Sequence, residues 1–154
     1  MPADAKGGGW LPWTAFGLSL AGLGVSLYLT VEHYTAGALL ACPETGVVNC
    51  QKVTSSPQSV VLGIPVAVLG LVFFAAMTAL TMQPAWRLTG YAVERLRLGL
   101  SVVGVVAVFY LVVVELFIVD ALCLWCTAVH VLTVALFTVL AYATALAPTN
   151  AARR

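Results

Sequence analysis

The stretch DALCLWCTAVHVLTVALFTVL, residues 120–140, places two cysteines three residues apart at the start of a long apolar run. A helix needs about 20 consecutive, mostly apolar residues to cross a bilayer. The run that contains this stretch meets that requirement, and so do three other runs in the chain. We therefore expect four transmembrane helices, at about residues 10–34, 63–82, 98–119 and 122–146.

The composition also places the chain in a bilayer. Of its 154 residues, 62% are hydrophobic and 8% are charged, proportions that lie outside those of soluble domains. Lipid forces the backbone to satisfy its own hydrogen bonds, and no series of short alternating segments indicates a barrel. We predict an all-α integral membrane protein, a single four-helix bundle over residues 1–154. The face with Gly17, Ala21 and Gly24 is expected to pack against a neighbouring helix.

The few charges indicate orientation. A net charge of +1 offers no basic surface for nucleic acid. Cytoplasmic loops collect Lys and Arg near helix ends. Lys52 stands alone on one side, and six basic residues lie on the other: Lys6, Arg87, Arg95, Arg97, Arg153 and Arg154. We expect a multi-pass protein of the cell (inner) membrane with both termini cytoplasmic and all four cysteines on the oxidising, extracytoplasmic side.

The Cys-x-x-C pair is placed for thiol chemistry. Asp120 is predicted to cap the N-terminus of the fourth helix, with Cys123 near its third position. Unpaired amides and the helix dipole at that end favour the thiolate, the species that attacks disulfides. Cys123, Cys126 and His130 follow helical spacing, so we expect one stripe that descends from the outer surface into the membrane.

The second cysteine pair lies in the predicted outer loop, residues 35–62. Cys42 and Cys50 bracket a segment rich in turn-forming residues, and a disulfide between them is feasible. Ser56 is expected to cap a short apolar helix that begins at Pro57. Because such a helix is poorly suited to water, we expect it to lie across the mouth of the bundle as a lid.

Non-catalytic interpretations of the cysteines also exist. Two structural disulfides would make the protein a scaffold, although a ring closed within one helical turn contributes little as a staple. A four-thiolate metal site is another alternative. The gap between Cys42 and Cys50 is loose for a zinc ligand pair and an oxidising compartment disfavours free thiolates, so we predict redox exchange and no metal.

Taken together, these residues resemble the bacterial branch of the vitamin K epoxide reductase family. The resemblance rests on Cys42 and Cys50 in the first outer loop, Ser56 after them, GIP entering the second helix, and the Cys-x-x-C that opens the fourth helix. The other family of membrane disulfide-generating oxidases has its Cys-x-x-C in the first outer loop, the opposite order. A thioredoxin-like domain is often fused to bacterial members, and this chain has no room for one. The resemblance therefore implies a separate thioredoxin-like partner, periplasmic or extracytoplasmic.

The resemblance also implies roles. Cys42 would meet the thiol partner, Cys50 would exchange with Cys123, and Cys126 would deliver electrons to a quinone of the ubiquinone or menaquinone type. Ser56 would support the site. The implied activity is that of a quinone-dependent thiol–disulfide oxidoreductase that supports disulfide formation in secreted proteins.

The residues independently favour a lipid-soluble electron acceptor, because a soluble nicotinamide cannot reach a dithiol beneath a lid. A quinone carries two electrons, which matches one dithiol-to-disulfide step. Trp125, Ile64 and Phe117 are predicted to line its pocket. His130 occupies a position where vertebrate members have a Tyr, and either donates a hydrogen bond to a quinone carbonyl or bonds across helices. Glu115, near the outer end of the third helix, either relays protons or extends to water.

Overall fold

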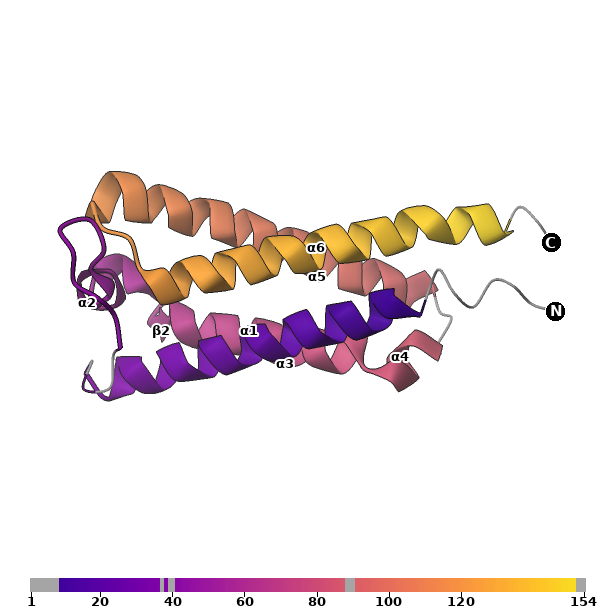
Figure 1. Ribbon diagram of the computed structural model, residues 1–154, viewed down its shortest axis with the longest axis horizontal. Helices are drawn as coiled ribbons and strands as arrows, with labels where there is room; N and C mark the ends of the chain where they lie inside the picture. The colour runs from indigo at the N-terminus through magenta and orange to yellow at the C-terminus, as the bar shows by residue number, and fades with distance from the viewer. Residues whose placement is uncertain (1–8, 37, 39–40, 88–90, 152–154) are drawn as a thin grey trace.

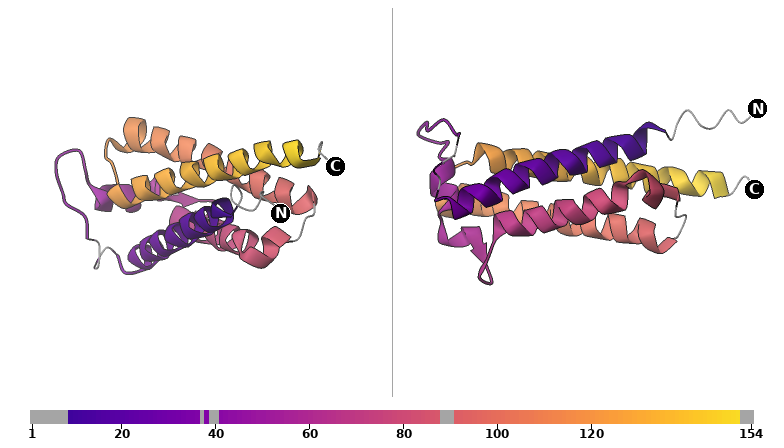
Figure 2. Two further views of the ribbon diagram at one scale, coloured as in Figure 1. Left: turned by 45° about the vertical axis from the view of Figure 1, so that its right-hand side comes forward. Right: turned by 90° about the horizontal axis from the view of Figure 1, so that it is seen from below.

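The computed structural model describes residues 9–36, 38, 41–87 and 91–151. The long helices run side by side along the molecule (Figure 1). They are α1 (Trp10–Tyr34), α3 (Val66–Thr81), α5 (Tyr91–Val114) and α6 (Leu124–Ala151). The start of α1 and the end of α6 lie at one end of the bundle, and the α2 region lies at the other, as all views agree (Figures 1 and 2).

Three segments are long and apolar enough to cross a membrane: Trp10–Tyr34, Ala92–Val119 and Leu124–Ala145. The chain is therefore a multi-pass membrane protein. The fourth long helix, α3, has 16 residues. At 1.5 Å per residue it spans about 24 Å, somewhat less than the hydrocarbon core. It begins three residues later than the sequence predicts, because Gly63 takes a positive φ of 82° and belongs to a turn.

Helix α1 packs against both α3 and α6, and α6 packs against α5. The central core contains Ala15, Phe74, Met77, Leu136 and Leu140. The predicted contact face of α1 was wrong. Gly17, Ala21 and Gly24 are exposed.

The buried face of α1 runs instead through Ala15, Ser19, Gly22 and Ser26. Gly22 faces the Phe74 ring so closely that a side chain there would overlap it. Gly22 thus allows the Phe74 ring of α3 to pack directly against α1.

The end of the bundle opposite the start of α1 holds the short elements α2 (Cys50–Thr54), η2 (Pro57–Ser59), β1 (Val60–Val61) and β2 (Ile64–Pro65). The two strands pair antiparallel through a turn at Leu62 and Gly63, and both turn residues have positive φ. Leu62 at the tip is 97% exposed. The predicted lid helix beginning at Pro57 is a single 3₁₀ turn followed by this hairpin, since Gly63 and β-branched valines suit a hairpin better than a helix.

At the other end of the bundle, Arg97 of α5 bonds to the end of α3 and to α4 (Gln83–Arg87). Its Nε donates to the Leu80 carbonyl at 2.7 Å, and its Nη2 donates to the Ala85 carbonyl at 2.6 Å. The guanidinium lies 4.2 Å from the centre of the Trp86 ring. These contacts satisfy carbonyls left free where α3 ends, and they hold α4 against α5.

Candidate active site

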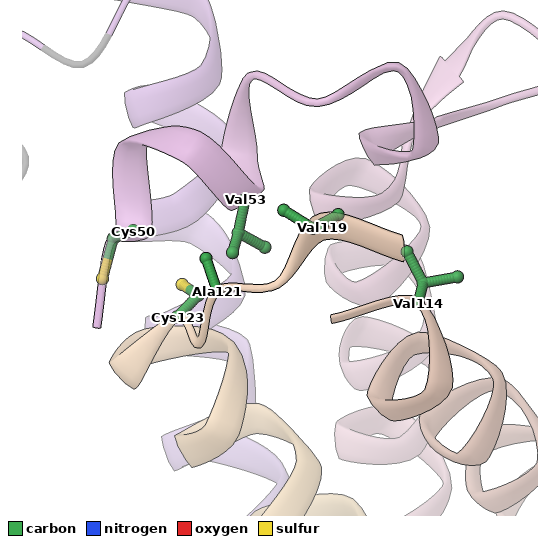
Figure 3. Close-up of a cluster of buried hydrophobic side chains, with 6 residues drawn as sticks. All are labelled: Cys50, Val53, Val114, Val119, Ala121 and Cys123. Carbon is green, nitrogen blue, oxygen red and sulfur yellow. The ribbon is translucent and has the colours of Figure 1, made fainter. Parts of the chain in front are cut away.

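All four cysteines gather at the end of the bundle that carries α2. Cys50 and Cys123 are fully buried in one apolar cluster with Val53, Val114, Val119 and Ala121 (Figure 3). Cys42 and Cys126 pack against the same cluster. Cys50 with its loop and Cys123 with its helix, 73 residues apart in the sequence, therefore meet in a buried apolar cluster.

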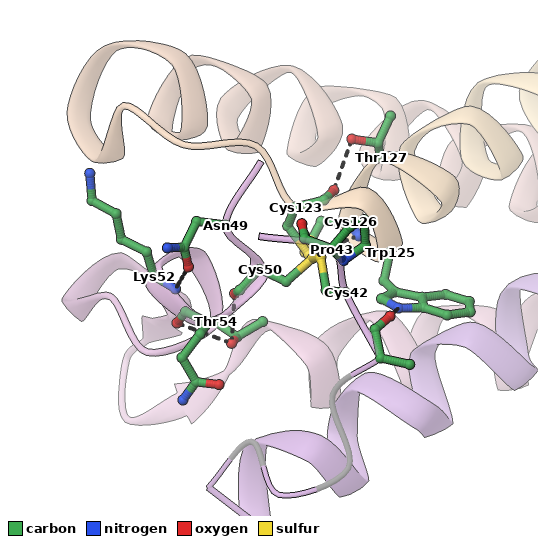
Figure 4. Close-up of a disulfide and its surroundings, with 12 residues drawn as sticks. Cys42, Pro43, Asn49, Cys50, Lys52, Thr54, Cys123, Trp125, Cys126 and Thr127 are labelled. Carbon is green, nitrogen blue, oxygen red and sulfur yellow. Dashed lines mark hydrogen bonds between the residues drawn. A yellow bond between two sulfur atoms is a disulfide. The ribbon is translucent and has the colours of Figure 1, made fainter. Parts of the chain in front are cut away.

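Cys42 and Cys50 form a disulfide, and Cys123 and Cys126 are free thiols beside it (Figure 4). The Cα atoms of the bonded pair are 6.2 Å apart. Cys50 is the first residue of α2, because the Asn49 side chain caps that helix by accepting a hydrogen bond from the Lys52 amide at 2.8 Å. The cap orients Cys50 toward the bundle.

Backbone pairing fixes the loop beside the Cys-x-x-C pair. The Leu122 amide donates to the Val47 carbonyl at 2.9 Å, and the Asn49 amide donates to the Leu122 carbonyl at 3.0 Å. Leu122 directly precedes Cys123, so these two bonds bring Cys50 and Cys123 into register.

Trp125 provides a second anchor. Its Nε1 donates to the Ala41 carbonyl at 2.9 Å, and its ring lies 4.8 Å from that of Tyr28. The residue next to Cys42 is thereby tied to the start of α6 and to α1. Both ends of the disulfide-closed loop are thus attached to the helix that carries the free thiols.

The start of α6 differs from the prediction. Asp120 does not cap this helix, because it ends the π-helical turn η3 (Glu115–Val119) in the left-handed conformation, with φ of 50°. Residues 121 and 122 follow in the segment that pairs with the loop, and α6 begins only at Leu124.

Cys123 takes the capping position instead. Its Sγ accepts a hydrogen bond from the Cys126 amide at 3.2 Å, as a serine hydroxyl would at a helix start, and its carbonyl accepts from the Thr127 amide at 2.9 Å. The Cys126 thiol also donates a hydrogen bond to the Cys123 sulfur. This hydrogen bond lowers the pKa of Cys123 and outweighs the opposing effect of burial. A lowered pKa favours the Cys123 thiolate, which is the direction that the sequence analysis expected, but its cause is the Cys126 thiol and not a cap at Asp120.

A cavity of about 430 Å³ lies beneath the cysteine cluster, between the four long helices and the outer loop. Its wall is mostly aliphatic and aromatic. Cys126 and His130 of α6 both line it, one turn apart, together with Glu115 and Ser56. Cys123 is not part of the wall. The Cys-x-x-C pair therefore has one thiol facing the loop cluster and one facing the cavity.

The predicted support and lining residues have mixed outcomes. Ser56 borders the cavity, but its hydroxyl donates back to the Val53 carbonyl at 2.8 Å and does not cap η2. Trp125, Ile64 and Phe117 do not line the cavity. Phe117 is 77% exposed on the π turn, and Ile64 lies on the hairpin.

Sequence reasoning missed Asn49, Tyr28 and the pairing of Val47 with Leu122. Asn49 carried a usable signal, since an Asn immediately before a short helix is a preferred cap. The pairing carried none, because it joins two irregular segments that are distant in the sequence.

Comparison with known proteins agrees with this geometry. No curated protein sequence matches the chain. The sequence model of the vitamin K epoxide reductase family matches residues 13–141, a range that contains all four cysteines and every residue of the cavity wall. The chain therefore belongs to the vitamin K epoxide reductase family, whose members are membrane oxidoreductases.

Proposed function

We propose that the protein is a quinone-dependent thiol–disulfide oxidoreductase that takes electrons from a reduced thioredoxin-like protein and supports disulfide formation in secreted proteins. One observation carries the proposal. Cys123 lies in the cluster with the Cys42–Cys50 disulfide, and Cys126, one helical turn away, lines an apolar cavity. A dithiol with these two surroundings is suited to receive electrons on one side and release them on the other.

The first transfer uses the outer pair. Cys42 is more accessible than Cys50, which is fully buried, so a partner thiolate attacks the Cys42 sulfur and releases Cys50. The partner's second thiol then completes its own disulfide, leaving Cys42 and Cys50 reduced. Two electrons and two protons have passed from the partner dithiol to the outer pair.

The second transfer joins the two pairs. When Cys123 and Cys126 are oxidised, the Cys50 thiolate attacks Cys123, the S–S bond of the inner pair breaks, and Cys126 leaves as a thiolate. Cys42 then attacks Cys50 and frees Cys123, which restores the outer disulfide. A Cys42–Cys50 disulfide beside a free Cys123–Cys126 dithiol is the product of this exchange.

The cavity suits a quinone. Its volume of about 430 Å³ falls in the range of small-molecule sites, and a mostly apolar wall with few polar groups matches an apolar ring with two carbonyl oxygens. A bound quinone supplies a two-electron couple that matches one dithiol-to-disulfide step. His130 is buried and lines the cavity, so its ring is available as a hydrogen-bond donor to a carbonyl. Ser56 supports the loop above the cavity, because its hydroxyl donates a hydrogen bond to the Val53 carbonyl of α2.

The proposed topology has four spans, with α3 as the shortest, in the cell (inner) membrane. The cysteine cluster and exposed Lys52 belong to the extracytoplasmic end, and Arg97 with Trp86 to the cytoplasmic end, where α1 begins and α6 ends. In an oxidising compartment electrons flow from thiols to a respiring quinone pool, which sets the direction of the reaction.

The test is quinone reduction by the purified protein in lipid nanodiscs, supplied with a reduced thioredoxin-like protein and short-chain ubiquinone or menaquinone analogues. We expect hydroquinone to form with oxidised partner in a ratio of one to one. A protein that contains stoichiometric zinc and reduces neither analogue would contradict the proposal and favour a metal-binding scaffold.

A further inference from the structure

Glu115 lies where the dithiol and the cavity meet. It opens the π-helical turn η3 at the end of α5, and it is 4% exposed. Its backbone carbonyl accepts hydrogen bonds from the Asp120 and Ala121 amides, the latter at 3.2 Å, so the segment that follows the turn is bonded back to Glu115. Inserted π turns are common at functional sites.

The Glu115 carboxyl interacts with both components of the proposed reaction. It interacts with the backbone amide of Cys123, and its charge acts on the sulfurs of Cys123 and Cys126. It also lines the cavity together with Cys126 and His130. Among the residues that the structure describes, Glu115 is the one carboxyl group in the cavity wall.

Oxidation of the dithiol requires a path for protons. Two S–H bonds break and one S–S bond forms, so two electrons and two protons must leave Cys123 and Cys126. The quinone proposed above takes up the two electrons and the two protons and becomes a hydroquinone. Unpaired charge is costly in an apolar cavity, so a proton needs a group that accepts it beside the sulfur and releases it inside the cavity.

We infer that Glu115 is the proton carrier between the Cys123–Cys126 dithiol and the quinone oxygens. Its carboxylate accepts a proton from a thiol as the sulfur is oxidised, donates that proton to an oxygen of the quinone, and returns to the carboxylate for the second proton. The inference rests on the proposed function, because it assigns a residue to the same site.

A second buried glutamate offers a matched control. Glu32 of α1 is 2% exposed, and neither of its carboxyl oxygens has a hydrogen-bond partner in the described part of the chain. Unlike Glu115 it is not part of the cavity wall. Both residues are buried carboxyl groups, but only Glu115 lies beside the dithiol and in the cavity wall.

The test compares Glu115→Gln, Glu115→Asp and Glu32→Gln. Gln keeps an oxygen that can face the Cys123 amide and cannot carry a proton. We expect Glu115→Gln to lower kcat for quinone reduction by about 100-fold or more, the usual contribution of a positioned acid–base group. Glu115→Asp, which keeps the carboxyl, should retain at least ten times the rate of the Gln variant by the same reasoning. Glu32→Gln should stay within about twofold of wild type.

A measurement without quinone tests Glu115 directly. In the infrared difference spectrum between dithiothreitol-reduced and oxidised protein, a carboxyl C=O band should report the change in the surroundings of Glu115. We expect the band to vanish in Glu115→Gln and to persist in Glu32→Gln.

Three results would overturn the inference: wild-type quinone reduction by Glu115→Gln, an unchanged carboxyl band in that variant, or equal losses in the Gln and Asp variants, which would indicate a purely structural role. Failure of the wild-type protein to reduce any quinone would instead refute the proposed function, and the infrared result would still report on Glu115.

Discussion

The two cysteine pairs are built differently. Cys42 and Cys50 are eight residues apart at the ends of a surface loop, and Cys42 is partly accessible. Cys123 and Cys126 lie within one turn at the start of α6, where a backbone N–H···S bond joins them and Cys126 borders a cavity. The loop pair is held in place by a few hydrogen bonds, whereas the helix pair is held in place by the packing of α6 in the bundle. A relay needs this difference, because one pair must meet a partner in water and the other must stay fixed above a buried acceptor.

The largest effect is expected for Cys126→Ala, which removes one thiol of the helix pair. Without the thiol that faces the cavity, quinone reduction should be lost completely. The Cys123 thiolate can still attack Cys50 of the outer disulfide, which breaks the Cys42–Cys50 bond and releases Cys42 as a thiolate. Because the Cys126 thiol that would also free Cys123 is absent, only Cys42 can reverse this step, and a Cys50–Cys123 disulfide should be detectable in part of the protein. Peptide mapping under non-reducing conditions measures it. A Cys42–Cys123 bond in its place would refute the proposed order of transfer.

A smaller loss is expected for His130→Phe. The substitution keeps an aromatic ring in the cavity wall and removes both ring nitrogens. If His130 donates to a quinone carbonyl, kcat/KM for quinone should fall about 10-fold, the value of one hydrogen bond of roughly 1.4 kcal/mol. The rate of thiol–disulfide exchange between the two cysteine pairs, measured by quenching samples with acid, should stay at its wild-type value. A loss confined to protein yield, with normal kcat/KM, would show that His130 serves packing alone.

On the other side of the comparison, Trp125→Phe tests how the loop pair is held. Phe keeps a ring beside Tyr28 and removes the hydrogen bond to the Ala41 carbonyl. One such bond contributes about 1 kcal/mol, so exchange between Cys50 and Cys123 should slow about 5-fold. Stopped-flow quenching with a thiol reagent measures the rate. Quinone reduction by a chemically reduced inner pair should not change, and a drop there would mean that Trp125 acts on the cavity.

Features that depend on local composition, such as the position of an apolar helix, could be predicted from the sequence. Features that depend on contacts between segments distant in the sequence could not. The range 10–34 coincides with α1, because length and apolarity decide where a lipid-exposed helix runs. The pairing of Leu122 with the loop displaced the start of α6 from the predicted cap at Asp120 to Cys123. The lining of the cavity was likewise not predictable. The sequence alone does not show whether an aromatic residue such as Phe117 faces outward or into a cavity. Here Phe117 lies on the π turn and is exposed.

The smallest expected effect is a shift in pH dependence. The Cys126 thiol donates a hydrogen bond to the Cys123 sulfur and holds the pKa of Cys123 below its ordinary value, while the nearby Glu115 charge opposes this. In Cys126→Ala the donor is gone, so the pKa of Cys123 rises and its thiolate forms only at higher pH. Alkylation of Cys123 by iodoacetamide, followed by mass spectrometry with Cys42 and Cys50 oxidised, should show a midpoint at higher pH in the variant than in wild type. An unchanged midpoint would mean that the start of α6 alone sets the acidity of Cys123, and the two thiols of the helix pair would then act independently rather than as one unit.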